Sequence, residues 1–135
     1  MQTKPYLSLA DVKKIAAGAE AEALANNWNV VISIVDDGGH LLWLQRHDGA
    51  APISAHISPA KARTAALGRR ESKIYEDLIN NGRYSFLSAP ELEGMLEGGV
   101  PIIVDGHVVG GVGVSGVKSV EDAQIAKAGI AALGL

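Results

Sequence analysis

The sequence predicts an α+β domain in which helices cover an antiparallel sheet. Two pairs of apolar, β-branched runs are each separated by an Asp-Gly step, which is the strongest short-range signal for a hairpin between antiparallel strands. Helical, alanine-rich runs stand before, between and after these pairs, so the predicted order is α–β–β–α–(α)–β–β–α. With 135 residues, the chain is expected to form a single domain over residues 1–135.

The first half of the chain starts with a helix and continues with a hairpin. Ser8 and Asp11 form a capping box variant, and apolar residues recur at helical spacing from there to about Asn27. Two β-rich runs follow, Val30–Asp36 and His40–His47, around an Asp-Asp-Gly-Gly turn. The alanine-rich inner face of the helix predicts close packing against the sheet.

The middle of the chain is predicted to be a loop followed by helices. Asp48–Ile57 contains glycine and proline and is predicted to be a loop. Ser58 and Pro59 then have the residue types of the N-cap and first position of a helix. Glu71–Asn80 is predicted as a further helix, and Tyr84–Pro90 as an irregular segment.

The second hairpin is unusually rich in glycine. Its strands, Val100–Val104 and His107–Ser115, meet at Asp105-Gly106, and residues 98–116 contain seven of the chain's 16 glycines. Glycine weakens a strand, because it has no side chain to pack and loses much entropy on folding. The crowding therefore indicates that something approaches the backbone closely, either another chain segment or a ligand.

The end of the chain argues against a nucleotide site. Gly111, Gly113 and Gly116 match the spacing of a dinucleotide fingerprint, but they lie within a hairpin strand rather than at the start of a helix. Only 19 residues follow Gly116, with no second strand, so no nucleotide cofactor is expected. Ser119 and Asp122 are interpreted as caps of the last helix.

Composition excludes several classes of protein. A net charge of −3 and an aromatic content of 4% argue against a nucleic-acid binder. The chain has no cysteine, which excludes disulfides, thiolate-held zinc and iron–sulfur clusters. The first residues lack a signal peptide's apolar core, and no apolar run has membrane-spanning length. A cytoplasmic location, without membrane partners, is the expectation.

Polar residues gather at the predicted end of the first hairpin. Arg46, His47 and Asp48 lead into the Gly/Pro loop, an arrangement that presents polar groups on a rigid scaffold. The alternative interpretation is a solvated loop with an Arg–Asp contact. His56 follows on the far side of the same loop, so two histidines are candidates to converge on one ligand.

The same residues favour haem over zinc. His47 and His56 have an irregular spacing and no partners typical of a zinc site, whereas haem needs only one or two axial nitrogens and an apolar slot. Lys61 and Thr64 share a helix face and could hold a carboxylate or a haem propionate, although a surface lysine is the simpler interpretation. The predicted pocket lies between the loop, this helix face and the Gly98-Gly99 turn.

Several segments together resemble the GlcG/HbpS family of small haem-binding proteins, over nearly the whole chain. The segments are Arg46-x-Asp48-Gly49-Ala50, Lys61-Ala62-x-Thr64-Ala65, Gly98-Gly99-x-Pro101-Ile102 with Asp105-Gly106, and Gly110-x-x-Gly113-Val114-Ser115-Gly116 with Asp122. The resemblance implies a profilin-like fold, with a central antiparallel sheet of about five strands between helices, and assembly into homo-oligomers. Some members bind haem or iron.

Three functional hypotheses follow. The first is a protein that binds haem or another small anionic ligand near a subunit interface, with His47 or His56 as axial ligand and Arg46 and Lys61 pairing with carboxylates. The second is an enzyme of lyase, isomerase or hydrolase type in a catabolic pathway, acting on a small organic acid or carbonyl compound. In it a histidine, His56 or His47, is the general base, oriented by Asp48, and Lys61 or the Gly98-Gly99 amides hold the anion. The third is an assembly module without a ligand.

Overall fold

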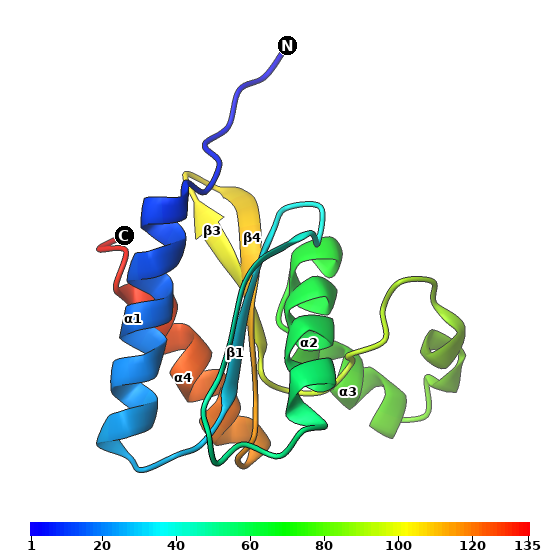
Figure 1. The fold of residues 1–135 in the computed structure, drawn as a ribbon. Coiled ribbons are helices and arrows are strands. Elements are labelled where there is room, and N and C mark those ends of the chain that lie inside the picture. Colours follow the sequence, from blue (N-terminus) through cyan, green and yellow to red (C-terminus); the bar gives the residue numbers. More distant parts are fainter.

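The computed structural model describes residues 1–135 and has three layers, with a sheet between helices (Figure 1). Helices α1 (Leu9–Ala25) and α4 (Ser119–Ala131) cover one face of the sheet, and α2 (Ser54–Gly68) covers the other. Helix α3 (Ser72–Asn80) and the short 3₁₀ helix η1 (Tyr84–Ser88) project beside α2 (Figure 1). No helix combines the length and the apolar character needed to cross a membrane.

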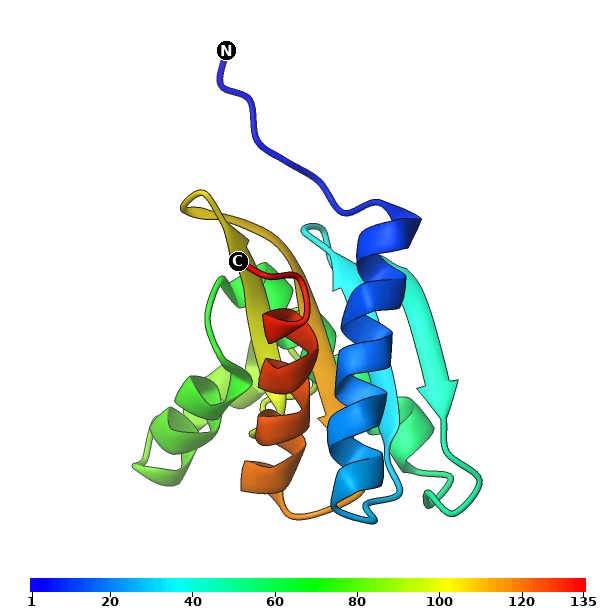
Figure 2. The same ribbon diagram turned by 90° about the vertical axis from the view of Figure 1, so that its left-hand side faces the viewer.

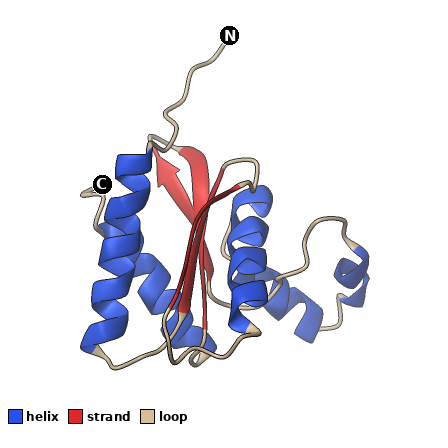
Figure 3. Cartoon of the chain, viewed as in Figure 1, coloured by secondary structure: helices blue, strands red, loops and turns tan.

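The sheet contains four antiparallel strands in the order β2-β1-β4-β3 (Figure 2). Figure 3 shows the sheet edge-on between the helices. The strands are β1 (Val31–Asp36), β2 (Leu41–Arg46), β3 (Gly99–Val104) and β4 (His107–Ser115). The predicted class and element order are confirmed, but the expectation of about five strands is wrong. Between α3 and β3 the chain forms η1 and turns, because this segment has no alternating β-branched run that could add a strand.

The helix starts agree with the sequence only in part. Ser8 caps α1, and its hydroxyl and the Asp11 carboxylate form the predicted capping box. Helix α2 instead begins one turn early, at Ser54, and contains Pro59. The predicted cap, Ser58, is buried in the helix, where its hydroxyl lies 2.8 Å from both the Ser33 hydroxyl and the Gly113 carbonyl oxygen. The Ser58 side chain therefore bonds to the sheet instead of capping the helix.

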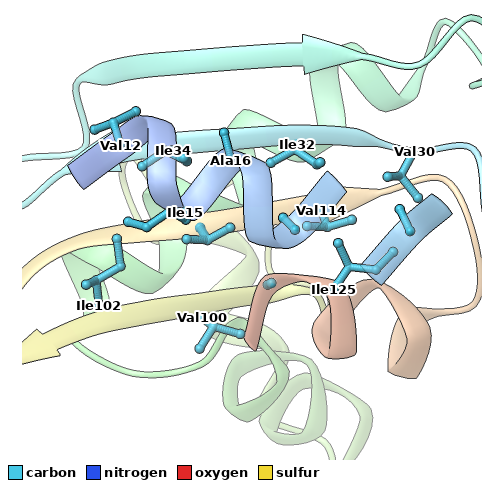
Figure 4. Close-up of a cluster of buried hydrophobic side chains, with 14 of the residues drawn as sticks. Val12, Ile15, Ala16, Val30, Ile32, Ile34, Val100, Ile102, Val114 and Ile125 are labelled. Carbon is cyan, nitrogen blue, oxygen red and sulfur yellow. The ribbon is translucent and has the colours of Figure 1, made fainter. Parts of the chain in front are cut away.

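The hydrophobic core lies between the sheet and the α1/α4 layer (Figure 4). Strand residues with side chains on this face, Ile32 and Ile34 of β1 and Val114 of β4, pack with Ile15 and Ile125 of the helices. All five side chains are fully buried. This layer follows the ordinary rule that an amphipathic helix buries its apolar face against a sheet.

The opposite face of the sheet is packed with small and polar residues. A Cβ atom on Gly113 would lie 2.1 Å from the Ser58 carbonyl oxygen, and one on Gly111 would lie 2.6 Å from the Ala62 carbonyl oxygen. The backbone of α2 therefore lies directly on these two glycines. Of the two explanations for the glycine-rich strand, close approach by another chain segment is the correct one here.

Candidate functional site

The residues predicted to form one pocket lie in three different environments. Arg46, His47 and Asp48 line an open depression at the end of β2. Lys61 and Thr64 are buried on α2, and Gly98 and Gly99 pack against Lys61. His56 is exposed on α2 and lines neither place.

The depression at the end of β2 has a volume of about 360 Å³, and most of the residues that line it are polar. Leu24, from the end of α1, is its only hydrophobic lining residue; the others are Asn29, Arg46, His47, Asp48 and Gly49. Arg46 and Asp48 are exposed at its surface. The depression therefore offers charged groups of both signs but only one hydrophobic side chain.

Backbone hydrogen bonds fix the turn that carries these side chains. The His47 N–H donates to the Val30 carbonyl oxygen at 3.0 Å, and the His47 carbonyl oxygen accepts from the Ala50 N–H at 3.0 Å. The Arg46 guanidinium donates to the Ala50 carbonyl oxygen at 3.2 Å. Gly49 packs so closely that a Cβ atom there would lie 2.5 Å from the Asn29 side-chain nitrogen. The turn is therefore well ordered by its own contacts.

One ring nitrogen of His47, Nε2, has no hydrogen-bond partner. Its Nδ1 lies 3.5 Å from the Val30 backbone nitrogen, a long hydrogen bond. Its Nε2 is buried and has no hydrogen-bond partner. A buried polar atom without a partner costs about 1–3 kcal/mol of stability. A ligand that engages this nitrogen would remove that cost.

Lys61 belongs to a buried ion pair that the sequence analysis missed. Its Nζ donates to the Val114 carbonyl oxygen at 2.9 Å and to Asp122 Oδ2 at 3.0 Å. The second carboxylate oxygen of Asp122 accepts from the Val117 N–H at 3.1 Å. Lys61 is 4% exposed and Asp122 2% exposed, so the pair joins α2, β4 and α4 inside the molecule. The ammonium is therefore already engaged and is not free to hold a ligand carboxylate.

The interpretation of Asp122 as a helix cap is wrong. Lys118 is the N-cap of α4, and the Glu121 carboxylate accepts from its N–H at 3.3 Å. Burial raises the pKa of the Asp122 carboxyl above its usual 3.8, although the Lys61 ammonium and the Val117 N–H oppose this shift. The sequence did contain a signal, because Asp122 stands at helical spacing with the buried residues Ile125, Ala126 and Gly129.

The Gly98-Gly99 turn is likewise used by the protein's own packing. Gly98 has a φ of +132°, and a Cβ atom there would lie 2.7 Å from Lys61 Nζ. The Gly99 N–H donates to the Ser72 hydroxyl at 2.8 Å. This amide is therefore not available as an anion-binding group. The hydroxyl of Thr64 is buried and, like His47 Nε2, has no partner.

The geometry also bears on the metal and enzymatic hypotheses. Nowhere does the chain bring together three side chains of the kinds that hold a metal ion, so His47 and His56 have no cluster around them. The candidate catalytic residues stand apart: Asp48 lines the depression, His56 is exposed on α2, and Lys61 is paired with Asp122.

Comparisons with known proteins give a consistent result. A family model described as haem-degrading protein HbpS-like matches residues 7–131. Protein GlcG of Escherichia coli (strain K12) is 57% identical over 115 residues, which cover 85% of each chain. The crystal structure of Klebsiella pneumoniae protein ORFY superposes with a TM-score of 0.91 at 30% identity, covering 99% of this chain and 94% of that one. The PduOC:haem complex superposes with a TM-score of 0.86 at 31% identity, covering 95% of both chains.

Proposed function

Because the chain belongs to the HbpS-like family, as its resemblance to GlcG and HbpS predicted, we propose that it binds haem or another small anionic ligand at the end of β2. In this proposal a second copy of the chain completes the site. The observation that carries it is the buried, unpartnered Nε2 of His47 beside the open depression.

The polar groups of the depression fit one part of haem. Arg46 is exposed at its rim, and a guanidinium pairs strongly with carboxylates such as the two propionates. While His47 Nδ1 accepts from the Val30 N–H, the neutral ring carries its proton on Nε2, which can donate to a propionate. In the other tautomer the ring gives up this long hydrogen bond, and Nε2 can ligate iron. Haem, when bound, supplies a redox-active iron. A structural relative, PduOC, has been crystallised with haem.

The apolar part of haem needs more surface than one chain offers here. Leu24 is the only hydrophobic residue of the depression, whereas a porphyrin ring is largely apolar. Immediately before the depression, the outer strand β2 exposes Leu41, Leu42 and Leu44 by 56%, 39% and 42%. β2 also has an unpaired edge (Figure 2). We infer that a second copy covers this strand and closes the site with apolar side chains.

Titration of the purified protein with haemin tests this proposal. We expect a saturable shift of the Soret band, which His47→Ala weakens strongly because it removes the proposed ligand contact. His40→Ala is the control, since His40 is an exposed histidine of the same hairpin that pairs with Asp36 at 3.0 Å and does not line the depression. His56→Ala examines the other predicted axial ligand.

Two results would overturn the proposal. One is the absence of any Soret shift. The other is a shift that neither His47→Ala nor His56→Ala changes, because the proposed contact would then play no part in binding.

A further inference from the structure

We propose a second ligand site at the opposite end of the sheet, where Lys4, Arg69 and His107 line a depression of about 420 Å³ that takes a small organic carboxylate. This site is independent of the haem proposal. The remaining lining residues are Ile103, Gly106 and Val108, and none of the six is acidic.

Three segments that are distant in the sequence build this depression. Lys4 comes from the N-terminal segment, Arg69 is the C-cap of α2, and His107 begins β4 after the β3–β4 turn. All three segments lie at the end of the molecule where the N-terminal segment emerges (Figure 1). The fold thus gathers three side chains that can donate hydrogen bonds to an anion, although the chain as a whole has a net charge of −3.

Arg69 is held in place before any ligand arrives. Its backbone is left-handed, with φ 59° and ψ 28°, a conformation that is unfavourable for residues other than glycine, asparagine and aspartate. Its Nη1 donates to the Asp37 carbonyl oxygen at 2.8 Å and to the Ala66 carbonyl oxygen at 3.0 Å. A guanidinium has five N–H donors, so others remain for a carboxylate. A fixed cation loses little conformational entropy when it binds.

The charge balance leaves the site attractive to an anion. Lys4 forms an ion pair with Asp37, and this hydrogen bond is the main reason why the pKa of the Asp37 carboxyl is lowered. With Asp37 ionised, the side chains of Lys4, Arg69 and Asp37 sum to one positive charge. His107 adds an N–H donor in either protonation state.

The rest of the depression suits a hydrocarbon group. Ile103 and Val108 are cross-strand partners of β3 and β4, and Ile103 is 52% exposed. At Gly106, in the hairpin turn, no atom beyond the two adjacent residues lies within 4 Å of the position of a Cβ atom, so the space above the turn is open. An apolar wall beside cations fits a carboxylate with a short aliphatic chain better than it fits inorganic phosphate.

Titrations followed by ¹H–¹⁵N NMR test this site with butyrate, acetate and inorganic phosphate as probes. We expect saturable shifts of the Gly106, His107 and Val108 amides, with butyrate binding several-fold more tightly than acetate because its methylene groups cover Ile103 and Val108. Arg69→Gln is expected to weaken butyrate binding about tenfold by removing a charge-assisted hydrogen bond. Lys4→Gln and His107→Gln should each weaken butyrate binding several-fold. They replace Arg69→Gln as the test if that variant proves to be less stable than the wild type.

Lys118→Gln is the matched control, because Lys118 is an exposed cation at the start of α4 that lines neither depression. It should leave the affinity unchanged. The proposal is overturned if the three amides show no saturable shift, if Lys118→Gln weakens binding as much as Lys4→Gln, or if phosphate binds more tightly than butyrate.

Discussion

The face of the sheet under α1 and α4 buries isoleucine and valine, whereas the face under α2 buries glycine, alanine and serine. Neighbouring residues of the same strand show the contrast. Ile32 lies in the apolar core, while the hydroxyl of the next residue, Ser33, lies at hydrogen-bond distance, 2.8 Å, from the Ser58 hydroxyl on α2. Successive side chains of a strand point to opposite faces, so one strand serves both interfaces.

The two interfaces hold the fold together in different ways. Under α1 and α4, the stabilising free energy comes from burial of apolar surface and grows with the buried area. Such packing tolerates small shifts of the helices. Under α2, the helix backbone lies directly on Gly111 and Gly113, and the Lys61–Asp122 pair adds a directional contact, so the position of the helix is restricted. Helix α2 connects the two proposed ligand sites. It begins after the loop that follows His47, and its C-cap residue, Arg69, lines the second site.

The largest effect is expected from breaking the ion pair on the α2 side. Lys61→Met leaves the Asp122 carboxylate buried without its cation and should lower the free energy of unfolding by about 3–5 kcal/mol. Urea denaturation measures this loss. The double variant Lys61→Met/Asp122→Leu should recover most of it, because no uncompensated charge remains. If the double variant is no more stable than Lys61→Met, the loss does not come from an uncompensated buried charge.

Adjacent residues of β1 allow the two faces to be compared directly. Ile32→Ala should cost about 2–5 kcal/mol, since it leaves a cavity in the apolar core. Ser33→Ala should cost only about 0.5–1.5 kcal/mol, because Ser58 can still donate to the Gly113 carbonyl oxygen. Denaturation midpoints of both variants test the ranking, and equal losses would contradict the contrast between the faces.

Adding one methyl group should reveal how tightly α2 is seated. Gly113→Ala should cost about 1–3 kcal/mol, because the new Cβ atom meets the backbone of Ser58 and Ala62. At Gly38 the nearest atom belongs to the exposed side chain of His40, which can move away, so Gly38→Ala should change stability by less than about 0.5 kcal/mol. A harmless Gly113→Ala would show that α2 can shift.

The pH dependence of stability should have opposite signs at two aspartates. Burial raises the pKa of Asp122 above 3.8, so its contribution to stability is full below pH 3.8 and is lost as the pH rises through the raised value. The hydrogen bond from Lys4 lowers the pKa of Asp37, so its contribution is present above pH 3.8 and is lost as the pH falls. The free energy of unfolding of the wild type, Asp122→Asn and Asp37→Asn, measured at several pH values around 3.8, gives the pH-dependent contribution of each aspartate. Slopes of the same sign would contradict this assignment.

Local chemistry made much of the fold predictable from the sequence. The Asp105-Gly106 hairpin forms with φ values of 52° and 79°, as a tight turn between paired strands requires, and Ser8 caps α1 as expected. Helix α2 was misplaced by one turn because Ser58 and Pro59 resemble a helix start, and only the fold reveals that Ser58 bonds to the sheet.

The candidate site was harder to predict, because its groups meet across long stretches of sequence. Lys61 was expected to face a ligand, but its partner Asp122 lies 61 residues away in the chain. Arg46, His47 and Asp48 line one depression, because they are consecutive at the end of one strand. The exposed leucines of β2, which the proposed second copy covers, become recognisable as a surface only once the fold places β2 at the edge of the sheet.

The mass of the haem-loaded protein tests the central claim, that two copies enclose the ligand beside β2. Size-exclusion chromatography with light scattering and Soret absorbance should show haem eluting with an assembly larger than the 14.0 kDa monomer. Leu44→Lys on β2 should give a monomer without haem, whereas Ile103→Lys, on the opposite edge strand, should change neither mass nor haem content. A Leu44→Lys monomer that retains haem would contradict the account.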